Sequence, residues 1–99
     1  MPPRCAVTFS VSAFEDLGRL RAWYADQGAA EAGERLLADV LAQVARLADF
    51  PESGRVVPEF GSACIREIVH PPFRIVYRLD PGRVRVVRIW RSERLLQLP

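Results

Sequence analysis

Residues 47–59 read L-A-D-F-P-E-S-G-R-V-V-P-E, and this segment joins a helical half of the chain to a β-rich half. The residue before Pro51 is biased away from helical backbone angles, so the preceding helix is expected to end there. Turn-forming residues follow in F-P-E-S-G, V-P and G-S. They predict an ordered segment over residues 51–62 that crosses from the helices to a sheet.

Two helices are predicted before this segment. Residues 5–9 are rich in β-branched and aromatic side chains and predict a short first strand. S-A-F-E at residues 12–15 matches a capping box, which predicts a helix that starts at Ser12 and stops at Gly28. The second helix spans residues 30–49, and the short link makes the pair an antiparallel hairpin. The apolar residues of the first helix recur at helical spacing and are expected in the core. They are Phe14, Leu17, Leu20, Trp23 and Tyr24.

Three strands are predicted after the crossing segment, at residues 65–69, 73–79 and 84–90. In the second of them, apolar residues alternate with arginines, which is the period of a half-buried strand. D-P-G-R at residues 80–83 has proline and glycine at the positions that a type II turn requires. The sequence therefore predicts an α+β fold of order β-α-α-β-β-β. A small antiparallel sheet, whose last three strands form a meander, packs against the N-terminal helical hairpin.

Size and composition predict a single globular domain over residues 1–99. The chain is 49% hydrophobic and its net charge is +2, which suits a packed core rather than disorder. No apolar run approaches the ~20 residues of a membrane span, so we expect a cytoplasmic protein. Cys5, Cys64 and His70 are too few for a four-ligand zinc site. We expect no metal, no cofactor and two free thiols that serve in packing.

Positive charge is concentrated in the second half of the chain. Residues 50–99 hold nine arginines against five carboxylates, whereas residues 1–49 hold five against seven. The planar guanidinium pairs bidentately with phosphates and carboxylates. One expectation is that arginines from neighbouring strands converge on the open face of the sheet and bind an anionic partner. The other is a solvated face whose charges prevent aggregation. The set consists of Arg66, Arg74, Arg78, Arg85, Arg88, Arg91 and Arg94.

Side chains that perform acid–base or nucleophilic chemistry are sparse. His70 is the only histidine, precedes two prolines and is expected to be a solvated turn residue. The carboxylates show no paired spacing, and Glu67 directly follows Arg66, so these two are expected on opposite faces of the sheet. The glycines lie in separate turns rather than in a phosphate-binding loop. Pattern alone therefore predicts no catalytic constellation.

Four segments, in this order and spacing, resemble the RelE/ParE superfamily of toxins from bacterial type II toxin–antitoxin modules. They are L-A-D-F-P-E-S-G-R-V-V-P-E at 47–59, I-R-E-I-V at 65–69, P-F-R-I-V-Y-R at 72–78 and V-R-V-V-R-I-W at 84–90. The resemblance covers nearly the whole chain. It implies an antiparallel sheet with a helical hairpin, in agreement with the elements expected above.

The superfamily implies two alternative activities. RelE-like members are ribosome-dependent endoribonucleases with basic residues on the sheet and a tyrosine or histidine near the C-terminus. Arg66 and Arg74 match two of the basic positions, and Arg94 is a third candidate. The tail R-S-E-R-L-L-Q-L-P has neither tyrosine nor histidine, so it lacks a base that would activate a ribose hydroxyl. ParE-like members inhibit DNA gyrase without acting as nucleases. The helical hairpin and the link at 47–59 resemble those of the ParE-like members.

The resemblance therefore predicts a ParE-like toxin of the plasmid-stabilization type that inhibits gyrase and is not an enzyme. A cognate antitoxin is expected to neutralise it in an oligomeric toxin–antitoxin complex. A RelE-like nuclease acting on ribosome-bound mRNA and a non-toxic relative that only binds an antitoxin are the alternatives. The residues expected to bind partners are Arg74, Arg78, Trp90, Arg91, Leu95 and Leu96.

Overall fold

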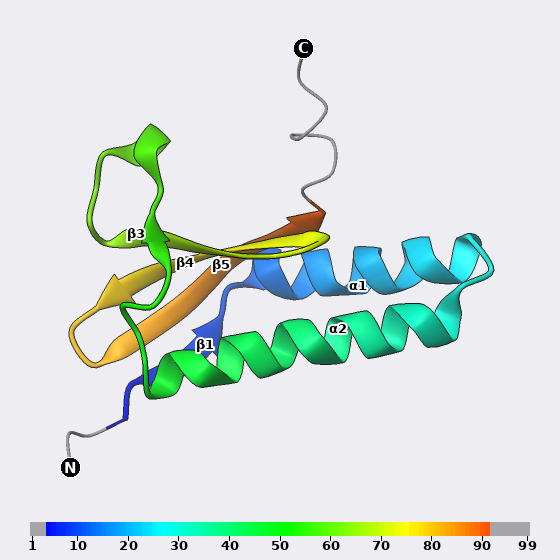
Figure 1. The fold of residues 1–99 in the computed structure, drawn as a ribbon, viewed down its shortest axis with the longest axis horizontal. Helices are drawn as coiled ribbons and strands as arrows, with labels where there is room; N and C mark the ends of the chain where they lie inside the picture. Colours follow the sequence, from blue (N-terminus) through cyan, green and yellow to red (C-terminus); the bar gives the residue numbers. More distant parts are fainter. Residues whose placement is uncertain (1–3, 92–99) are drawn as a thin grey trace.

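The computed structural model describes residues 4–91, in which two helices lie along one face of a single sheet (Figure 1). The helical elements are α1 (Val11–Asp26), α2 (Ala30–Ala45) and the short 3-10 turns η1 (Arg46–Ala48) and η2 (Pro58–Phe60). The strands are β1 (Ala6–Phe9), β2 (Arg55–Val56), β3 (Ile65–His70), β4 (Phe73–Asp80) and β5 (Arg83–Arg91). Within residues 4–91, no helix combines the length and the hydropathy that a membrane span requires.

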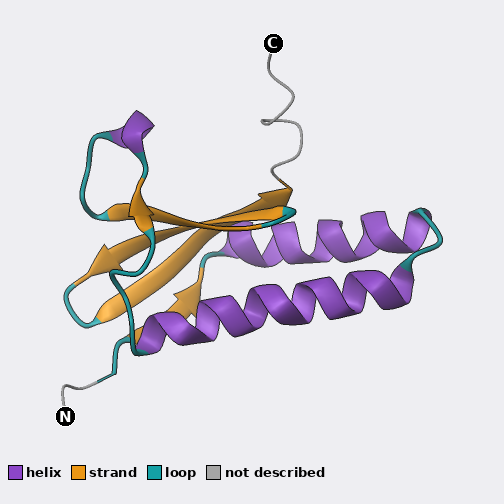
Figure 2. Cartoon of the chain, viewed as in Figure 1, coloured by secondary structure: helices purple, strands orange, loops and turns teal. Residues whose placement is uncertain are grey.

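The five strands form one sheet in the order β1-β5-β4-β3-β2 (Figure 2). β3, β4 and β5 form the predicted antiparallel meander, and the α+β fold with a helical hairpin on the sheet is confirmed. β1 pairs with β5 in the parallel direction, so the sheet is mixed rather than wholly antiparallel. β2 adds a two-residue strand within the crossing segment, where no strand was predicted.

α1 begins two residues earlier than predicted. Ser10 is its N-cap, and the Ser10 hydroxyl oxygen accepts the N–H of Ala13 at 3.0 Å. The predicted cap at Ser12 is wrong because Ser10, the residue directly after β1, already takes the capping position. The Ser10 N–H donates to the Val86 carbonyl at 2.8 Å, and its hydroxyl donates to the Val87 carbonyl at 3.1 Å. These bonds fix Ser10 in an extended conformation, from which the chain turns directly into the helix.

The core lies between the hairpin and the sheet. α2 and η1 together cover the predicted second helix up to Ala48, and their apolar stripe is mostly buried, with Leu41 exposed. Each fully buried aliphatic or aromatic side chain contributes about 1.5–3 kcal/mol, so this contact dominates the stability of the fold. The core includes Leu37, Val40, Val44 and Leu47 from the helical side and Phe73, Ile75, Tyr77, Val84, Val86 and Ile89 from the strands.

Three expectations about burial are wrong. Phe14 and Trp23 were expected in the core, but they are 68% and 43% exposed. The buried side of α1 passes through Ala13 and Tyr24, and Phe14 is one residue, or about 100°, away from that line. Both cysteines are free thiols, as expected, but Cys64 is exposed rather than packed.

Candidate functional site

The register of β3 and β4 separates the arginines that were expected to act together. Phe73 and Tyr77 are fully buried and point toward the helices, so they define an inner face of the sheet. Arg66 pairs with Tyr77 and therefore projects from the inner face, because directly paired residues point to the same side. Arg74 projects from the opposite, outer face. The expected convergence of Arg66 and Arg74 on one open face is wrong, whereas the expected separation of Arg66 from Glu67 is confirmed.

Arg91 also lies on the inner face, because it pairs with Phe73. Its guanidinium carbon sits 4.1 Å from the centre of the Trp23 ring and 5.3 Å from that of Tyr24. Such cation–π contacts are favourable and hold the end of β5 against α1. Arg91 therefore does not belong to the set of outer-face arginines in which it was expected.

Arg66 braces the crossing segment. Its guanidinium donates hydrogen bonds to the carbonyl oxygens of Ala63 at 3.1 Å, Glu52 at 3.2 Å and Gly54 at 3.1 Å. The Tyr77 hydroxyl donates to the Pro51 carbonyl at 2.7 Å and accepts the Gly54 N–H at 2.9 Å. Burial raises the pKa of the Tyr77 hydroxyl above its usual value. Together these bonds fix F-P-E-S-G on the sheet, which gives this part of the motif a structural role.

Glu67 and Arg74 form the centre of the outer face. The Glu67 side chain is fully buried, and Arg74 donates to both of its carboxylate oxygens at 2.7 Å. Arg55 from β2 approaches the same carboxylate at 3.4 Å, and Glu59 lies 3.4 Å from Arg74. The hydrogen bonds from Arg74 lower the pKa of Glu67, and the carboxylate raises the pKa of Arg74. Arg74 therefore already holds an anion that the chain itself supplies.

A second buried carboxylate ties the outer face to α1. Asp16 is 5% exposed and accepts the backbone N–H of Ile89 at 2.9 Å, beyond the point where β1 ends. Arg88 donates to the same carboxylate at 2.8 and 3.1 Å, which raises the pKa of Arg88. Trp90 lies between Arg88 and Arg74, with its ring centre 5.4 and 5.8 Å from their guanidinium carbons. Sequence reasoning missed Asp16, because a single acid within an apolar stripe gives no clear signal.

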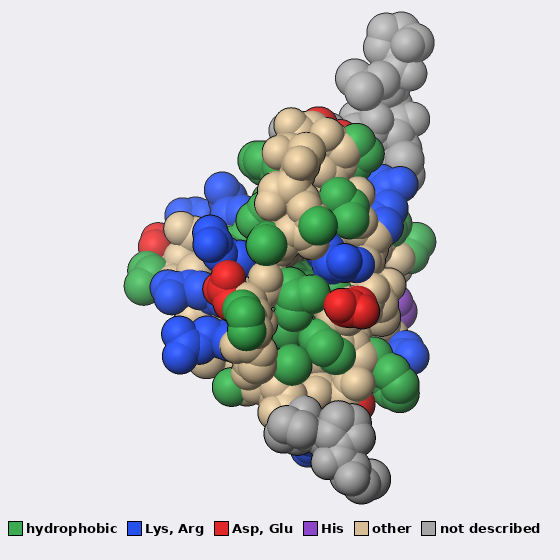
Figure 3. Space-filling view, turned by 90° about the vertical axis from the view of Figure 1, so that its left-hand side faces the viewer, with side chains coloured by type: hydrophobic (Ala, Val, Ile, Leu, Met, Phe, Trp, Pro, Cys, Tyr) green, Lys and Arg blue, Asp and Glu red, His purple; other side chains and the backbone are tan. Residues whose placement is uncertain are grey.

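The end of the outer face nearest the β4–β5 turn carries unbalanced positive charge. Arg78 and Arg85 are directly opposite each other, and Arg83 is opposite Asp80. Asp80 pairs with Arg78 at 3.1 Å. Within residues 4–91, neither Arg83 nor Arg85 has an ion-pair partner. Basic side chains gather at this end of the molecule (Figure 3).

Within residues 4–91, the outer face brings guanidinium groups together without an imidazole or a phenol beside Arg74. The single histidine, His70, is not the solvated turn residue that was expected, because it is half-buried at the end of β3 on the inner face, where it pairs with Phe73. The two tyrosines, Tyr24 of α1 and Tyr77 of β4, are buried in the core between the helices and the sheet. Consequently no imidazole or phenol of the chain lies beside Arg74 on the outer face. Guanidinium groups there can neutralise a negative charge, but they do not accept a proton at neutral pH.

Comparison with known proteins assigns the chain to a family. Residues 7–96 match the family model described as the ParE toxin of the type II toxin–antitoxin system parDE. The chain belongs to this toxin family. It is accordingly a toxin component of a type II toxin–antitoxin system.

Solved structures share the fold of this ParE-family chain. A chromosomal ParDE toxin–antitoxin system from P. aeruginosa matches with a TM-score of 0.74 and 20% identity, covering 89% of this chain and 96% of that one. The toxin–antitoxin complex RelBE2 from Mycobacterium tuberculosis matches with a TM-score of 0.68 and 21% identity, covering 91% and 99%. At these identities the likeness concerns the fold alone. Among curated protein sequences, none matches the chain.

The predicted partner-binding residues are dispersed. Arg74, Arg78 and Trp90 lie on the outer face, and Arg91 lies on the inner face. Arg94, Leu95 and Leu96 are outside the described residues 4–91. The structure therefore brings Arg74 and Trp90 into contact and separates both from Arg66 and Arg91.

Proposed function

We propose that this toxin inhibits DNA gyrase through protein–protein contacts and that a cognate antitoxin neutralises it. Membership of the ParE family supports the toxin role. The observation that carries the choice of gyrase over RNA is the pairing of Arg74 with Glu67 at 2.7 Å. The arginine expected to clamp a phosphate is thereby neutralised from within the chain.

A RelE-like nuclease would need two features that are poorly represented on the outer face. It would need cationic groups that converge on one phosphate, but Arg66 and Arg74 project from opposite faces. It would also need a group that removes the proton from the ribose hydroxyl. Convergent charge stabilisation contributes strongly to cleavage, so the divergence of Arg66 and Arg74 disfavours the nuclease alternative. The lack of a histidine or tyrosine beside Arg74 disfavours it further.

An antitoxin partner is supported by the two structural neighbours, which are described as toxin–antitoxin systems or complexes. On the described part of the chain, the candidate contacts are Arg78 and Trp90 on the outer face and Arg91 on the inner face. Leu95 and Leu96 are further candidates by their apolar character. In this proposal the chain is oligomeric through its complex with the antitoxin and needs no cofactor.

The proposal is tested by a supercoiling assay with purified gyrase, relaxed plasmid and the purified chain. We expect inhibition that rises with the amount of toxin and is relieved by the antitoxin. Unchanged supercoiling at molar excess of a folded toxin would contradict the proposal. Chain boiled before the assay is the control, because it retains the charge but not the fold.

The alternatives are separated by two measurements in expressing cells. New mRNA 5′ ends within translated codons would support the ribosome-dependent nuclease. Absence of growth arrest on induction of the chain alone, with the protein shown to be folded, would support the non-toxic relative. The gyrase proposal predicts growth arrest without such 5′ ends.

A further inference from the structure

We propose that the end of the sheet at the β4–β5 turn binds the phosphate backbone of duplex DNA. The binding groups are Arg78, Arg83 and Arg85, which we call the basic cluster. This inference goes beyond the proposed function, and it is tested with DNA alone, so its outcome is independent of any contact with gyrase. It rests on the charge balance of the basic cluster, on its access to solvent and on the polar character of its surroundings.

The basic cluster carries positive charge that the described part of the chain does not balance. Arg78 of β4 lies directly opposite Arg85 of β5, and Arg83 lies opposite Asp80. The Asp80 carboxylate pairs with Arg78 at 3.1 Å. Among residues 4–91, Arg83 and Arg85 have no ion-pair partner. Because like charges directly opposite each other destabilise a sheet, an anion bound between Arg78 and Arg85 would stabilise this one.

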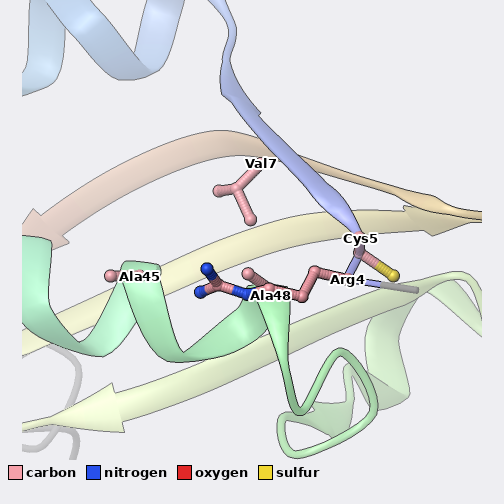
Figure 4. A pocket seen from close by; sticks show the side chains of 5 residues that line it. All are labelled: Arg4, Cys5, Val7, Ala45 and Ala48. Atoms are coloured by element: carbon pink, nitrogen blue, oxygen red, sulfur yellow. The ribbon is translucent and has the colours of Figure 1, made fainter. Parts of the chain in front are cut away.

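Other arginines near the basic cluster already hold carboxylates. Arg74 and Arg88, further along the outer face, donate to the two buried carboxylates at 2.7 and 2.8 Å. Arg4, at the start of β1, lines a hollow beside Ala48 at the end of the helical hairpin (Figure 4), and its guanidinium donates to Asp49 at 2.9 Å. Within residues 4–91, the arginines of β4 and β5 on the outer face that hold no carboxylate therefore lie beside the β4–β5 turn.

The basic cluster is open to solvent and has a charge spacing that suits a duplex. All three side chains are exposed, and the helices cover the opposite face of the sheet (Figure 1). The neighbours of Arg83 and Arg85 on β1 are Ala6 and Thr8, which are short and leave both guanidinium groups accessible. Arg83 and Arg85 are two residues apart on one strand, which separates them by about 6.6–6.8 Å, and Arg78 lies on the neighbouring strand about 5 Å from Arg85. Duplex DNA carries about one negative charge per 1.7 Å of its axis, so a patch of this length faces several phosphates.

The surroundings of the basic cluster favour DNA over an acidic protein. The buried centre of a protein–protein interface is apolar and depleted in charged residues. Within residues 4–91, none of the exposed large hydrophobic side chains belongs to β4, β5 or the turn between them. Contacts to phosphates, in contrast, need cationic and polar side chains rather than apolar surface. An acidic protein would find positive charge at this end of the sheet but no apolar surface to bury.

The same surroundings favour a duplex over single-stranded RNA. Proteins that bind single strands combine a basic groove with aromatic side chains on which the unstacked bases lie. Trp90 is the aromatic side chain that β3, β4 and β5 present on the outer face, but it is half-buried and its ring lies between Arg74 and Arg88. A duplex keeps its bases stacked and presents a regular array of phosphates, which needs no aromatic contact.

The test is an NMR titration of the isotope-labelled full chain with a short DNA duplex of mixed sequence. Three phosphate contacts predict that log K falls with log[salt] with a slope of about −2.7, so the affinity should fall about fortyfold between 50 and 200 mM salt. The amide signals that shift should belong to the β4–β5 turn and the adjoining part of β5. Shifts confined to the helices, or no shift at 50 mM salt, would overturn the proposal.

Arginine variants provide the second readout. Arg83→Gln and Arg85→Gln should each reduce the slope by about 0.9 and weaken DNA binding about tenfold at 50 mM salt. Arg35→Gln removes the same charge from an exposed position of α2, which begins at the end of the molecule opposite the β4–β5 turn (Figure 1). It should change neither the slope nor the affinity. An equal loss in all three variants would show a general attraction between the chain and DNA without a defined site, and would overturn the proposal.

Two ligands of other classes complete the test. A single-stranded RNA and a polyglutamate peptide, each matched to the duplex in total charge, should both bind more weakly than the duplex. Equal or tighter binding of the RNA would show that the duplex form is not required, and equal or tighter binding of polyglutamate would show that phosphate is not required. Either result would overturn the proposal.

Discussion

Replacing Glu67 with glutamine tests whether the outer face is held together by its internal ion pair. The Glu67 carboxylate is fully buried, and Arg74 is 16% exposed. Removing one partner of a buried pair costs about 3–5 kcal/mol. The glutamine amide of the variant still accepts one hydrogen bond, and Arg74 still has the Glu59 carboxylate at 3.4 Å. We therefore expect the free energy of unfolding to fall by about 2.5 kcal/mol. With a urea dependence of about 1.5 kcal/mol/M, the unfolding midpoint falls by about 1.7 M.

The chain contains a matched control for this experiment. Arg21 donates to Glu34 at 2.7 Å, the same distance as from Arg74 to Glu67, but these side chains are 62% and 57% exposed. Exposed pairs contribute little, so Glu34→Gln should cost about 0.5 kcal/mol. Equal urea midpoints for the Glu67→Gln and Glu34→Gln variants would show that burial does not strengthen the Glu67–Arg74 pair.

The pH dependence of the same variant supplies an independent check. Arg74 lowers the pKa of Glu67 from its usual 4.5 in the folded chain. A carboxylate with a lowered pKa stabilises the fold above its unfolded pKa and loses this contribution as the pH falls through the folded value. The stability difference between the natural chain and Glu67→Gln should therefore be largest near neutral pH and shrink below pH 4.5. A difference that grows on acidification would contradict the assignment.

Three further substitutions probe the supports of the site. Gly54→Ala should destabilise the chain by about 1–3 kcal/mol in urea unfolding, because a Cβ at Gly54 would lie 2.6 Å from the Tyr77 ring and hydroxyl. Gly18→Ala, in an open position of α1, should instead stabilise the chain by about 0.5–1 kcal/mol. If both substitutions changed the stability in the same direction, the close packing of Gly54 against Tyr77 would not explain the result. Tyr77→Phe should cost about 1–3 kcal/mol, because the buried Gly54 N–H loses its acceptor. Since burial raises the Tyr77 pKa above 10.0, the stability that its neutral hydroxyl provides is lost as the pH rises beyond that value. The gap between Tyr77→Phe and the natural chain should therefore narrow in alkaline urea titrations. Asp16→Ala should cost about 1–3 kcal/mol and speed amide exchange at Ile89, whose N–H would lose its partner; unchanged exchange would show that Asp16 does not protect this edge.

The elements with strong patterns were predictable, because local chemistry determined them. The helical segment stops at Ala48, shortly before Pro51, and the alternating pattern of residues 73–79 forms β4. Gly82 has a φ of +70°, as its turn requires. The start of α1 was not predictable from the capping pattern at Ser12. The hydrogen bonds that select Ser10 come from β5, which is more than 70 residues away in the sequence.

The face of the sheet from which each arginine projects was partly predictable. His70 and Phe73 pair across a two-residue connection, and counting outward from them places Arg66 opposite Tyr77 and Arg74 opposite Val69. Together with the strand period of two, this register puts Arg66 and Arg74 on opposite faces of the sheet. The observed ion pair, which the count does not predict, means that Arg74→Ala would also leave the buried Glu67 carboxylate without its main partner.

The bulge in β5 could not be predicted by counting residues outward from a turn. The register shifts between Val76 and Tyr77 of β4, so that one residue of β5, Val87, has no direct partner. Without the shift, Arg88 would face Ile75 on the inner side; with it, Arg88 and Trp90 reach the outer face beside Arg74. A bulge depends on long-range packing rather than on a local motif. The contact between Trp90 and two arginines was therefore not predictable from the local sequence.

We propose that this ParE-family toxin acts on gyrase and not on RNA. The most direct measurement is the superhelicity of a reporter plasmid, sampled through the first minutes after the chain is induced in cells without antitoxin. We predict loss of negative supercoiling before growth stops, while translated mRNAs remain intact. Plasmid that keeps its superhelicity while growth stops would contradict the account, most clearly if cleaved mRNA accumulates at the same time.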